Sequence, residues 1–242
     1  MKIDILTLFP EMFKGVLESS IIKRAIESEL VFINILDYRE FSLDKNKKVD
    51  DYSYGGGAGM VIRVQPIVDC LKSIEGIENA KKILTTPKGN NYHQAKAKDL
   101  ANEKHIVIVC GHYEGIDERI VEYVDEEISI GDYILTGGEI AALVIIDSVV
   151  RLIPGTLGNE ESKIDESFEE VLEYPQYTRP DVYEGKAVPD VLISGNHENI
   201  RKYRRYESLK VTYERRPDLL IGLNLSKEDL QMLERIKNKE KF

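Results

Sequence analysis

The chain has 242 residues, of which 42% are hydrophobic and 31% charged, and its formal net charge is −10. This length can form one sizeable hydrophobic core or two modest ones. The negative charge argues against a protein whose whole surface coats nucleic acid, although a local basic face can still bind RNA. The two cysteines, Cys70 and Cys110, lie far apart in apolar surroundings, which favours buried thiols over a disulfide.

The sequence predicts neither a membrane protein nor a structural zinc protein. The first ten residues, MKIDILTLFP, are too short and too charged for a signal peptide and are typical of a first strand. The longest apolar run, IAALVIIDSVV, is too short to span a bilayer and contains Asp147. No four-ligand Cys/His cluster occurs in the sequence. We therefore expect a cytoplasmic protein that is not bound to a membrane.

Strand-like and helix-like segments alternate over the first two thirds of the chain. Patterns typical of short strands occur at residues 2–9, 31–38, 81–86, 105–111 and 126–131. Helical segments are predicted between and after them, at 11–28, 92–103, 115–124 and 139–150. This alternation predicts an α/β fold with a mostly parallel sheet covered on both faces. Ligands of such sheets bind beyond the carboxyl ends of the strands, where glycine-containing turns at 85–90, 110–115 and 129–138 are expected to meet.

The composition changes after Pro154. A polar, acidic stretch is followed by an irregular, proline-punctuated one, and residues 199–216 are then helical and strongly basic. A final helix is expected from Ser226, which forms a capping-box pattern with Asp229. We predict two domains, residues 1–160 and 176–242, joined by a flexible linker at 161–175; the second domain is small and helical.

Two glycine-rich segments allow both a structural and a functional interpretation. YSYGGGAGM, residues 52–60, lacks the Lys-Ser/Thr of a phosphate loop and fits no dinucleotide fingerprint. It is either a flexible turn or a backbone surface for a nucleotide, with Gly55, Gly56, Gly57 and Arg63 as candidate RNA contacts. SIGDYILTGG, residues 129–138, is either a tight strand-to-helix crossover or a loop whose backbone groups and apolar side chains hold a small ring.

Two further segments carry charged candidates. In CGHYEGIDER, Glu114 is a candidate catalytic acid, although the favourable position of acids near a helix N-terminus also explains it; no role is assigned to His112. Arg151 ends the apolar helix and is followed by the acidic segment KIDESFEE. An arginine and a carboxylate that converge can stabilise an oxyanion and remove a proton.

Seven segments, in this order along nearly the whole chain, resemble the bacterial tRNA (guanine-N1)-methyltransferases of the TrmD family: LTLFPEMF, VDDYSYGGGAGMV, CGHYEGIDER, SIGDYILTGGE, RLIPGTLGN, YPQYTRPDVYEGKAVPDVLISGNH and RRPDLL. The resemblance implies a SPOUT-type α/β fold with a C-terminal deep trefoil knot and a helical tRNA-binding domain. It also implies a homodimer with the active site between subunits. The implied reaction is methyl transfer from S-adenosyl-L-methionine to N1 of the guanosine 3′ of the anticodon.

By this resemblance, residues of the glycine-containing turns bind the cofactor: Thr86, Pro87, Gly111, Ile130, Gly131, Asp132, Tyr133, Ile134, Leu135, Gly137 and Gly138. Arg151 would stabilise O6 of guanine and a carboxylate would remove the N1 proton. The family pattern is an acidic residue followed by Asp-Ser-Phe, whereas this chain reads Asp165-Glu166-Ser167-Phe168, so Asp165 is favoured as the base and Glu166 is the alternative. A second departure is Ala141, where the family commonly has proline.

The basic segment, residues 199–216, is a candidate RNA-binding surface. Positive side chains interleaved with tyrosines are typical of a surface that contacts RNA phosphates, although a solvated helix is the simpler alternative. The predicted RNA contacts there are Arg201, Arg204, Arg205 and Arg215. No resident metal site is predicted, although Mg²⁺ assistance in proton removal is left open. The alternative functions are another SPOUT methyltransferase acting on ribose or rRNA and a non-catalytic RNA-binding relative; a Rossmann oxidoreductase is disfavoured because the first strand lacks the required glycine turn.

Overall fold

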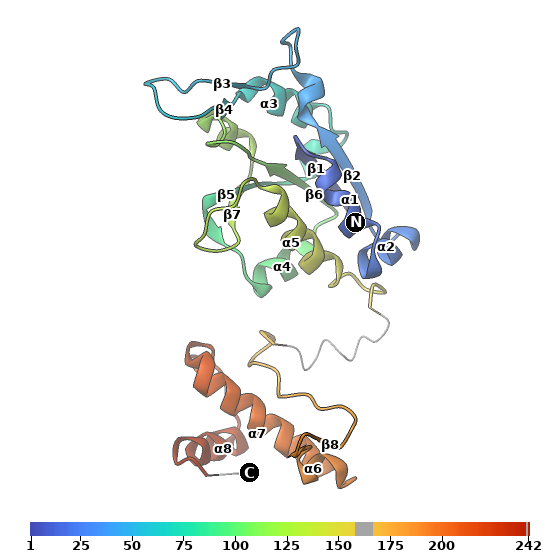
Figure 1. The fold of residues 1–242 in the computed structure, drawn as a ribbon, viewed down its shortest axis with the longest axis vertical. Coiled ribbons are helices and arrows are strands. Elements are labelled where there is room, and N and C mark those ends of the chain that lie inside the picture. Colours follow the sequence, from blue (N-terminus) through green and yellow to red (C-terminus); the bar gives the residue numbers. More distant parts are fainter. Residues whose placement is uncertain (158–166, 241) are drawn as a thin grey trace. The chain divides into compact units, whose positions relative to one another are not determined.

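The computed structural model describes residues 1–157, 167–240 and 242 (Figure 1). The chain divides into two compact units, Met1–Gly158 and Asn159–Phe242, which are considered separately below. Asp165 and Glu166, the two candidate bases, lie outside the described residues. None of the helices in the described part is long and apolar enough to cross a membrane.

The N-terminal unit is built on a five-stranded parallel sheet, which confirms the mostly parallel α/β fold expected from the sequence. Its strand order is β2-β1-β6-β5-β7. The register is regular in the centre, where Ile5 pairs with Ile35 on one side and Ile108 on the other, and it shifts between Thr85 and Asn90. The strands are β1 (Lys2–Thr7), β2 (Phe32–Asp37), β5 (Lys81–Asn91), β6 (His105–Cys110) and β7 (Glu126–Ser129).

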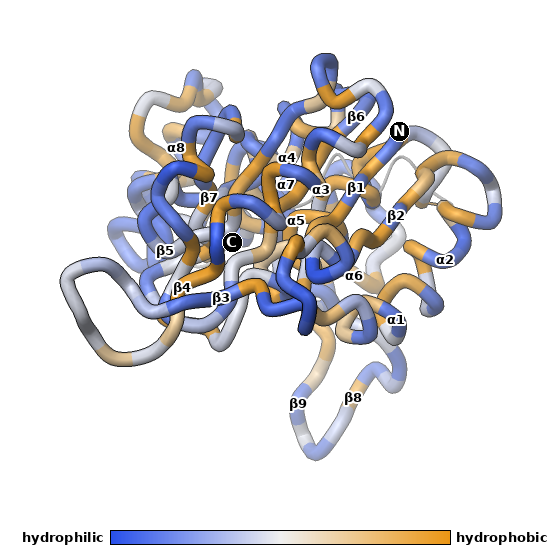
Figure 2. The backbone as a smooth tube through the Cα atoms, turned by 90° about the horizontal axis from the view of Figure 1, so that it is seen from above, coloured by the Kyte–Doolittle hydropathy of each residue, from blue (hydrophilic) through white to orange (hydrophobic). Residues whose placement is uncertain are grey.

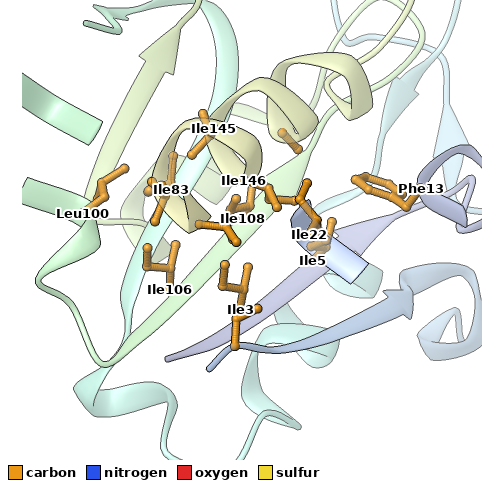
Figure 3. Close-up of a cluster of buried hydrophobic side chains, with 14 of the residues drawn as sticks. Ile3, Ile5, Phe13, Ile22, Ile83, Leu100, Ile106, Ile108, Ile145 and Ile146 are labelled. Carbon is orange, nitrogen blue, oxygen red and sulfur yellow. The ribbon is translucent and has the colours of Figure 1, made fainter. Parts of the chain in front are cut away.

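Alternation along the strands gives the sheet two apolar faces, because successive side chains point to opposite sides. Ile106 and Ile108 of β6 belong to one core cluster, whereas Val107 and Val109 belong to the other. Figure 3 shows the first cluster, in which Ile145 and Ile146 of the apolar helix lie near the strand isoleucines. β1 and this helix are correspondingly hydrophobic in Figure 2. Both faces of the sheet are therefore covered, as a parallel sheet requires.

In the described N-terminal unit, four helices cover the first face, and one α-helix with three 3₁₀ turns covers the second. The first group is α1 (Glu11–Leu17), α2 (Ser20–Glu27), α4 (Gln94–Ala101) and α5 (Glu139–Val150). The second group is α3 (Val64–Lys72), η1 (Tyr38–Phe41), η2 (Ile77–Asn79) and η3 (Glu118–Tyr123).

Two predicted helices differ in the structure. The helix expected over 11–28 is divided into α1 and α2, with Ser20 in the left-handed region at φ 51°. The helix expected over 115–124 is wrong in type and start, since only the 3₁₀ turn η3 forms there. The reason is tertiary: the backbone at Gly115 and Asp117 bonds to Ile62, which holds 115–117 extended.

A short hairpin of β3 (Asp50–Asp51) and β4 (Val61–Ile62) carries the glycine-rich loop. The loop extends away from the body of the unit in Figure 1. Four of its glycines, Gly55, Gly56, Gly57 and Gly59, have positive φ. Neither strand was expected from the sequence, because two residues are too few to show a periodic pattern.

A buried charge lies near the start of β1. Asp4 is almost completely buried and contacts His105 Nε2 at 2.6 Å, Asn34 Nδ2 at 3.0 Å and Lys2 Nζ at 3.0 Å. Burial by itself raises the pKa of Asp4, but the hydrogen bonds from Asn34, His105 and Lys2 outweigh it and lower the pKa. The ionised carboxylate therefore joins β1, β2 and β6 at the edge opposite their carboxyl ends.

The C-terminal unit is mainly helical and has a small core of its own. Tyr206 and Leu209 pack against Met232, Leu233 and Ile236. The capping box at Ser226 and Asp229 forms as expected and starts the last helix at Lys227. The segment expected to be irregular also contains a two-stranded hairpin. The elements are β8 (Val182–Tyr183), β9 (Lys186–Ala187), α6 (Asp190–Ile193), α7 (His197–Arg215), η5 (Pro217–Leu220) and α8 (Lys227–Lys237).

Candidate functional site

A cavity of about 490 Å³ lies beside the register shift of β5, the ends of β6 and β7 and the start of α5. The three glycine-containing turns expected at one sheet edge all contribute to it. Of the predicted cofactor residues, Asp132 is the one that does not line this cavity. The others do: Thr86, Pro87, Gly111, Ile130, Gly131, Tyr133, Ile134, Leu135, Gly137 and Gly138. Their contact with a cofactor stays a prediction.

The floor of the cavity is held together by backbone contacts between segments distant in sequence. The Gly138 amide donates to the Gly111 carbonyl at 2.8 Å, and His112 and Gly137 form an antiparallel bridge. A methyl group on Gly138 would lie 2.2 Å from Thr85 Oγ1 and 3.0 Å from Cys110 Cα. Glycine is therefore required at 138 by its close approach to Thr85, at the register shift of β5, and to the end of β6.

The loop after β7 forms an apolar wall. Ile134 is 81% exposed, and the Tyr133 hydroxyl donates to the Ile130 carbonyl at 3.2 Å. Exposed apolar side chains beside the backbone of a glycine-containing loop suit a planar, partly polar ligand. This arrangement supports the functional interpretation of SIGDYILTGG, while the same residues also make the tight crossover that was the structural alternative.

Glu114 connects the cavity with the glycine-rich loop between β3 and β4. It lines the cavity, and its amide donates to the Met60 carbonyl at 3.1 Å. Its side chain covers Gly59 so closely that a methyl group there would lie 2.3 Å from Glu114 Cγ. Glu114 therefore does not cap a helix. Arg63, at the base of the same loop, donates to Asp51 Oδ2 at 2.6 Å.

Sequence reasoning missed the polar groups beneath the cavity. Glu139, the first residue of α5, is fully buried, and its Oε1 accepts a hydrogen bond from Thr7 Oγ1 at 2.8 Å. His112 lines the cavity, with Nδ1 3.6 Å from Glu139 Oε2. Burial, and then the charge of Glu139, raises the pKa of the Cys110 thiol well above its ordinary value, so this thiol stays protonated. The one sequence feature that could have indicated these polar groups is Gly-Gly-Glu at the start of the helix. That pattern is equally typical of an ordinary helix terminus.

Comparison with known proteins identifies the family. A family model described as tRNA (Guanine-1)-methyltransferase TrmD matches residues 1–221. The chain belongs to the TrmD family. A relative from Clostridium botulinum (strain Hall) is 56% identical over 234 residues, covering 96% of this chain and 97% of the relative. A relative from C. botulinum (strain Eklund 17B) is 55% identical, covering 99% of this chain and 100% of the relative. A relative from C. novyi (strain NT) is also 55% identical, covering 97% of each chain. All three are named tRNA (guanine-N(1)-)-methyltransferase.

In this TrmD-family chain, the predicted catalytic residues are described only in part. Arg151 follows α5 directly, as expected, and is half-buried, but it does not line the cavity. Its predicted partners Asp165 and Glu166 lie outside the described residues. The convergence of an arginine and a carboxylate therefore stays a prediction.

The basic helix α7 separates the predicted RNA-contacting arginines into two kinds. Arg201, Arg204 and Arg215 are exposed, and the Arg204 guanidinium lies 5.0 Å from the ring centre of Tyr174. Arg205 instead forms a two-point ion pair with Asp229, at 2.7 Å and 3.1 Å, inside the C-terminal unit. The structure therefore gives Arg205 a packing role that its spacing did not reveal.

The described residues contain no group of three or more His, Cys, Asp or Glu side chains placed to hold a metal ion. Both cysteines are buried and unpaired by disulfide. Burial raises the pKa of the Cys70 thiol to about 12. A thiol in this state is a poor metal ligand and a poor nucleophile.

Proposed function

We propose that this protein is a tRNA methyltransferase that transfers a methyl group from S-adenosyl-L-methionine to N1 of the guanosine immediately 3′ of the anticodon. The observation that carries the proposal is the family match over nearly the whole chain, together with a cavity lined by the glycine-containing turns of that family. We propose a cytoplasmic location, since the proposed substrate is a tRNA.

The residues around the cavity fit the proposed cofactor. Backbone groups of the turns can bond an adenine and a ribose, and the apolar wall at Ile130, Ile134 and Leu135 can cover a ring. A cavity of about 490 Å³ is within the range of small-molecule sites. When bound, S-adenosylmethionine supplies a methyl group that is already electrophilic.

The remaining chemistry is assigned to the chain's own side chains. Guanine N1 carries a proton at neutral pH and becomes nucleophilic as the proton leaves. We assign proton removal to Asp165, with Glu166 as the alternative, and stabilisation of the negative charge on O6 to Arg151. The comparison that separates the two acids is a single-turnover assay of Asp165→Asn and Glu166→Gln. The variant of the true base will lose methyl transfer while still binding cofactor.

We propose that the enzyme is a homodimer with its active site between subunits. The supporting observation is an apolar surface formed by Met12 and Val16 of α1 and Ile140 and Val144 of α5, each 38–44% exposed. α1 and α5 pack against each other, so these side chains can form one patch. A second copy of the chain is its proposed occupant, as a twofold contact buries the same patch on both partners. Sedimentation of Val144→Glu, which would lower the dimer fraction, tests this.

We also propose that the chain forms the deep trefoil knot of SPOUT proteins. The support is the position of Gly138, which lies directly against Thr85 of β5 and against Cys110 and Gly111 at the end of the neighbouring strand β6. The C-terminal unit is proposed to bind tRNA phosphates through Arg201, Arg204 and Arg215. The exposed glycine-rich loop at 55–57 is proposed to approach the substrate, since Glu114 joins it to the cavity wall.

The test is methyl transfer to a tRNA transcript with nucleoside mass spectrometry of the product. We expect 1-methylguanosine, and no product when the guanosine 3′ of the anticodon is replaced by adenosine. Methylated ribose would support another SPOUT activity. Cofactor and tRNA binding without turnover would indicate a non-catalytic relative, and either result would refute the proposal. Adding and removing Mg²⁺ in the same assay tests its assistance.

A further inference from the structure

Two buried polar atoms lie next to each other beneath the cavity, and neither has a hydrogen-bond partner among the described residues. They are His112 Nδ1 and Glu139 Oε2, 3.6 Å apart. The Glu139 side chain is 1% exposed and that of His112 20%. An unsatisfied buried donor or acceptor costs about 1–3 kcal/mol, and more when it is charged. Such a pair at a candidate site therefore needs a physical explanation.

Both side chains are fixed on the sides that face away from the pair. Glu139 Oε1 accepts from Thr7 Oγ1 at 2.8 Å, and Thr7 Oγ1 itself accepts from the Phe9 amide at 2.9 Å. The His112 ring packs against Phe9 at a centroid distance of 4.6 Å and against Tyr113 at 5.2 Å. These contacts hold each side chain in place, with one polar atom directed toward the other.

The pair connects two of the segments that form the cavity. His112 follows β6 and Glu139 begins α5, and Gly137 lies between them. A methyl group on Gly137 would lie 2.3 Å from both unpaired atoms, so the backbone leaves no space for another side chain there. A charge-assisted N–H···O bond is about 2.7–2.9 Å long, so an approach of roughly 0.8 Å would complete the bond.

Thr7 satisfies only Oε1 of the Glu139 carboxylate, and Oε2 has no hydrogen-bond partner among the described residues. Tyr38 and Cys110 are also influenced by the Glu139 charge. Burial, foremost, raises the pKa of both groups, so both stay neutral, and neither residue type can become a cation. Within the described part of the chain, His112 is the one basic side chain at ion-pair distance from Glu139, with Nδ1 3.6 Å from Oε2. A buried carboxylate is strongly stabilised by a hydrogen-bonded cation and costly without one.

We infer that His112 and Glu139 are positioning residues, whose mutual hydrogen bond forms when the β6–η3 and β7–α5 segments close around the cofactor. The inference rests on the proposed function, because it takes S-adenosylmethionine as the ligand that draws the segments together. Cofactor binding and the bond then stabilise each other, as two coupled equilibria must. Neither residue touches the reacting atoms.

The decisive variant is His112→Phe, which keeps a ring for Phe9 and Tyr113 to pack against and removes both nitrogens. Calorimetry on the full chain should show S-adenosylmethionine binding weakened by about tenfold to a hundredfold, the equivalent of one charge-assisted hydrogen bond. The melting temperature of the cofactor-free variant should be unchanged or higher, because an unpaired buried nitrogen has been removed. A purely structural histidine would give the reverse: lower melting temperature and unchanged affinity.

Two further variants complete the experiment. Glu139→Gln keeps the shape and an acceptor for Thr7, and it should weaken cofactor binding in the wild-type background but not further in the His112→Phe background. His93→Phe makes the same chemical change at an exposed histidine that accepts from the Lys96 amide, and it should leave affinity unchanged. Wild-type affinity in His112→Phe, or additive losses in the double variant, would overturn the inference alone. Failure of the wild-type protein to bind S-adenosylmethionine would overturn the proposed function and the inference with it.

Discussion

Replacing Gly138 by alanine tests whether the close contact of β5 and β6 with the start of α5 holds the candidate site together. The new methyl group would lie 2.2 Å from Thr85 Oγ1 and 3.0 Å from both Cys110 Cα and the Gly111 amide nitrogen. Two of these atoms belong to the backbone and cannot rotate away. Thr85 can rotate, but it would then lose its hydrogen bond to the Val109 carbonyl, which is 3.1 Å long.

The expected destabilisation follows from these contacts. Overpacking a close-packed site costs about 1–3 kcal/mol. Loss of the Thr85 hydrogen bond adds about 1 kcal/mol. We expect the free energy of unfolding of the N-terminal unit to fall by roughly 2–4 kcal/mol, which is about a 30- to 1000-fold shift toward the unfolded state. Cofactor affinity should fall as well, because the displaced backbone lines the cavity.

Hydrogen exchange is the suitable assay because the chain has two compact units and no tryptophan. Peptides from β1 and β6 report on the N-terminal unit, and peptides from α7 provide an internal reference that should not change. The matched control is Gly15→Ala in α1, where a methyl group meets nothing within 4 Å; it should stabilise the unit by up to about 1 kcal/mol. A loss below about 0.5 kcal/mol in Gly138→Ala would refute the close-packing argument.

Three further predictions address the RNA surface, the pH dependence and the chemistry. Arg204→Ala should weaken tRNA binding and reduce the salt slope by about one, measured by filter binding at several salt concentrations. Arg205→Ala should instead lower the melting temperature of the C-terminal unit, by breaking a half-buried ion pair worth roughly 2 kcal/mol; an unchanged temperature would restore it as an RNA contact. Because the pKa of Asp4 is lowered in the folded protein, its contribution to stability is complete above its ordinary value of 3.8 and is lost as the pH falls below it. Acid unfolding of Asp4→Asn should lack this dependence. Arg151→Ala should slow methyl transfer roughly 100-fold or more at saturating cofactor, and full activity would exclude its role.

Much of the local structure could be read from the sequence because it depends on neighbours in the chain. The alternation of side chains in β1 and β6 follows from the two-residue period of a strand, which is visible without knowing what packs on either face. The capping box at Ser226 spans three residues and forms wherever the helix starts. The glycine-containing turns were placed at one sheet edge by the rule that parallel strands end together, and the structure confirms that they share one cavity.

The features that failed or were missed depend on contacts between distant residues. The helix expected after Gly115 is prevented by backbone bonds to Ile62, and Thr7 meets Glu139 across 132 positions of sequence. Arg204 and Arg205 are adjacent and chemically identical, yet the turn of α7 directs one to the surface and the other to Asp229. The sequence by itself determined the five strands of the parallel sheet, the capped start of α8 and the family. The tertiary structure decided which charges are paired and which polar atoms are buried, because burial and pairing are properties of residues brought together only by folding.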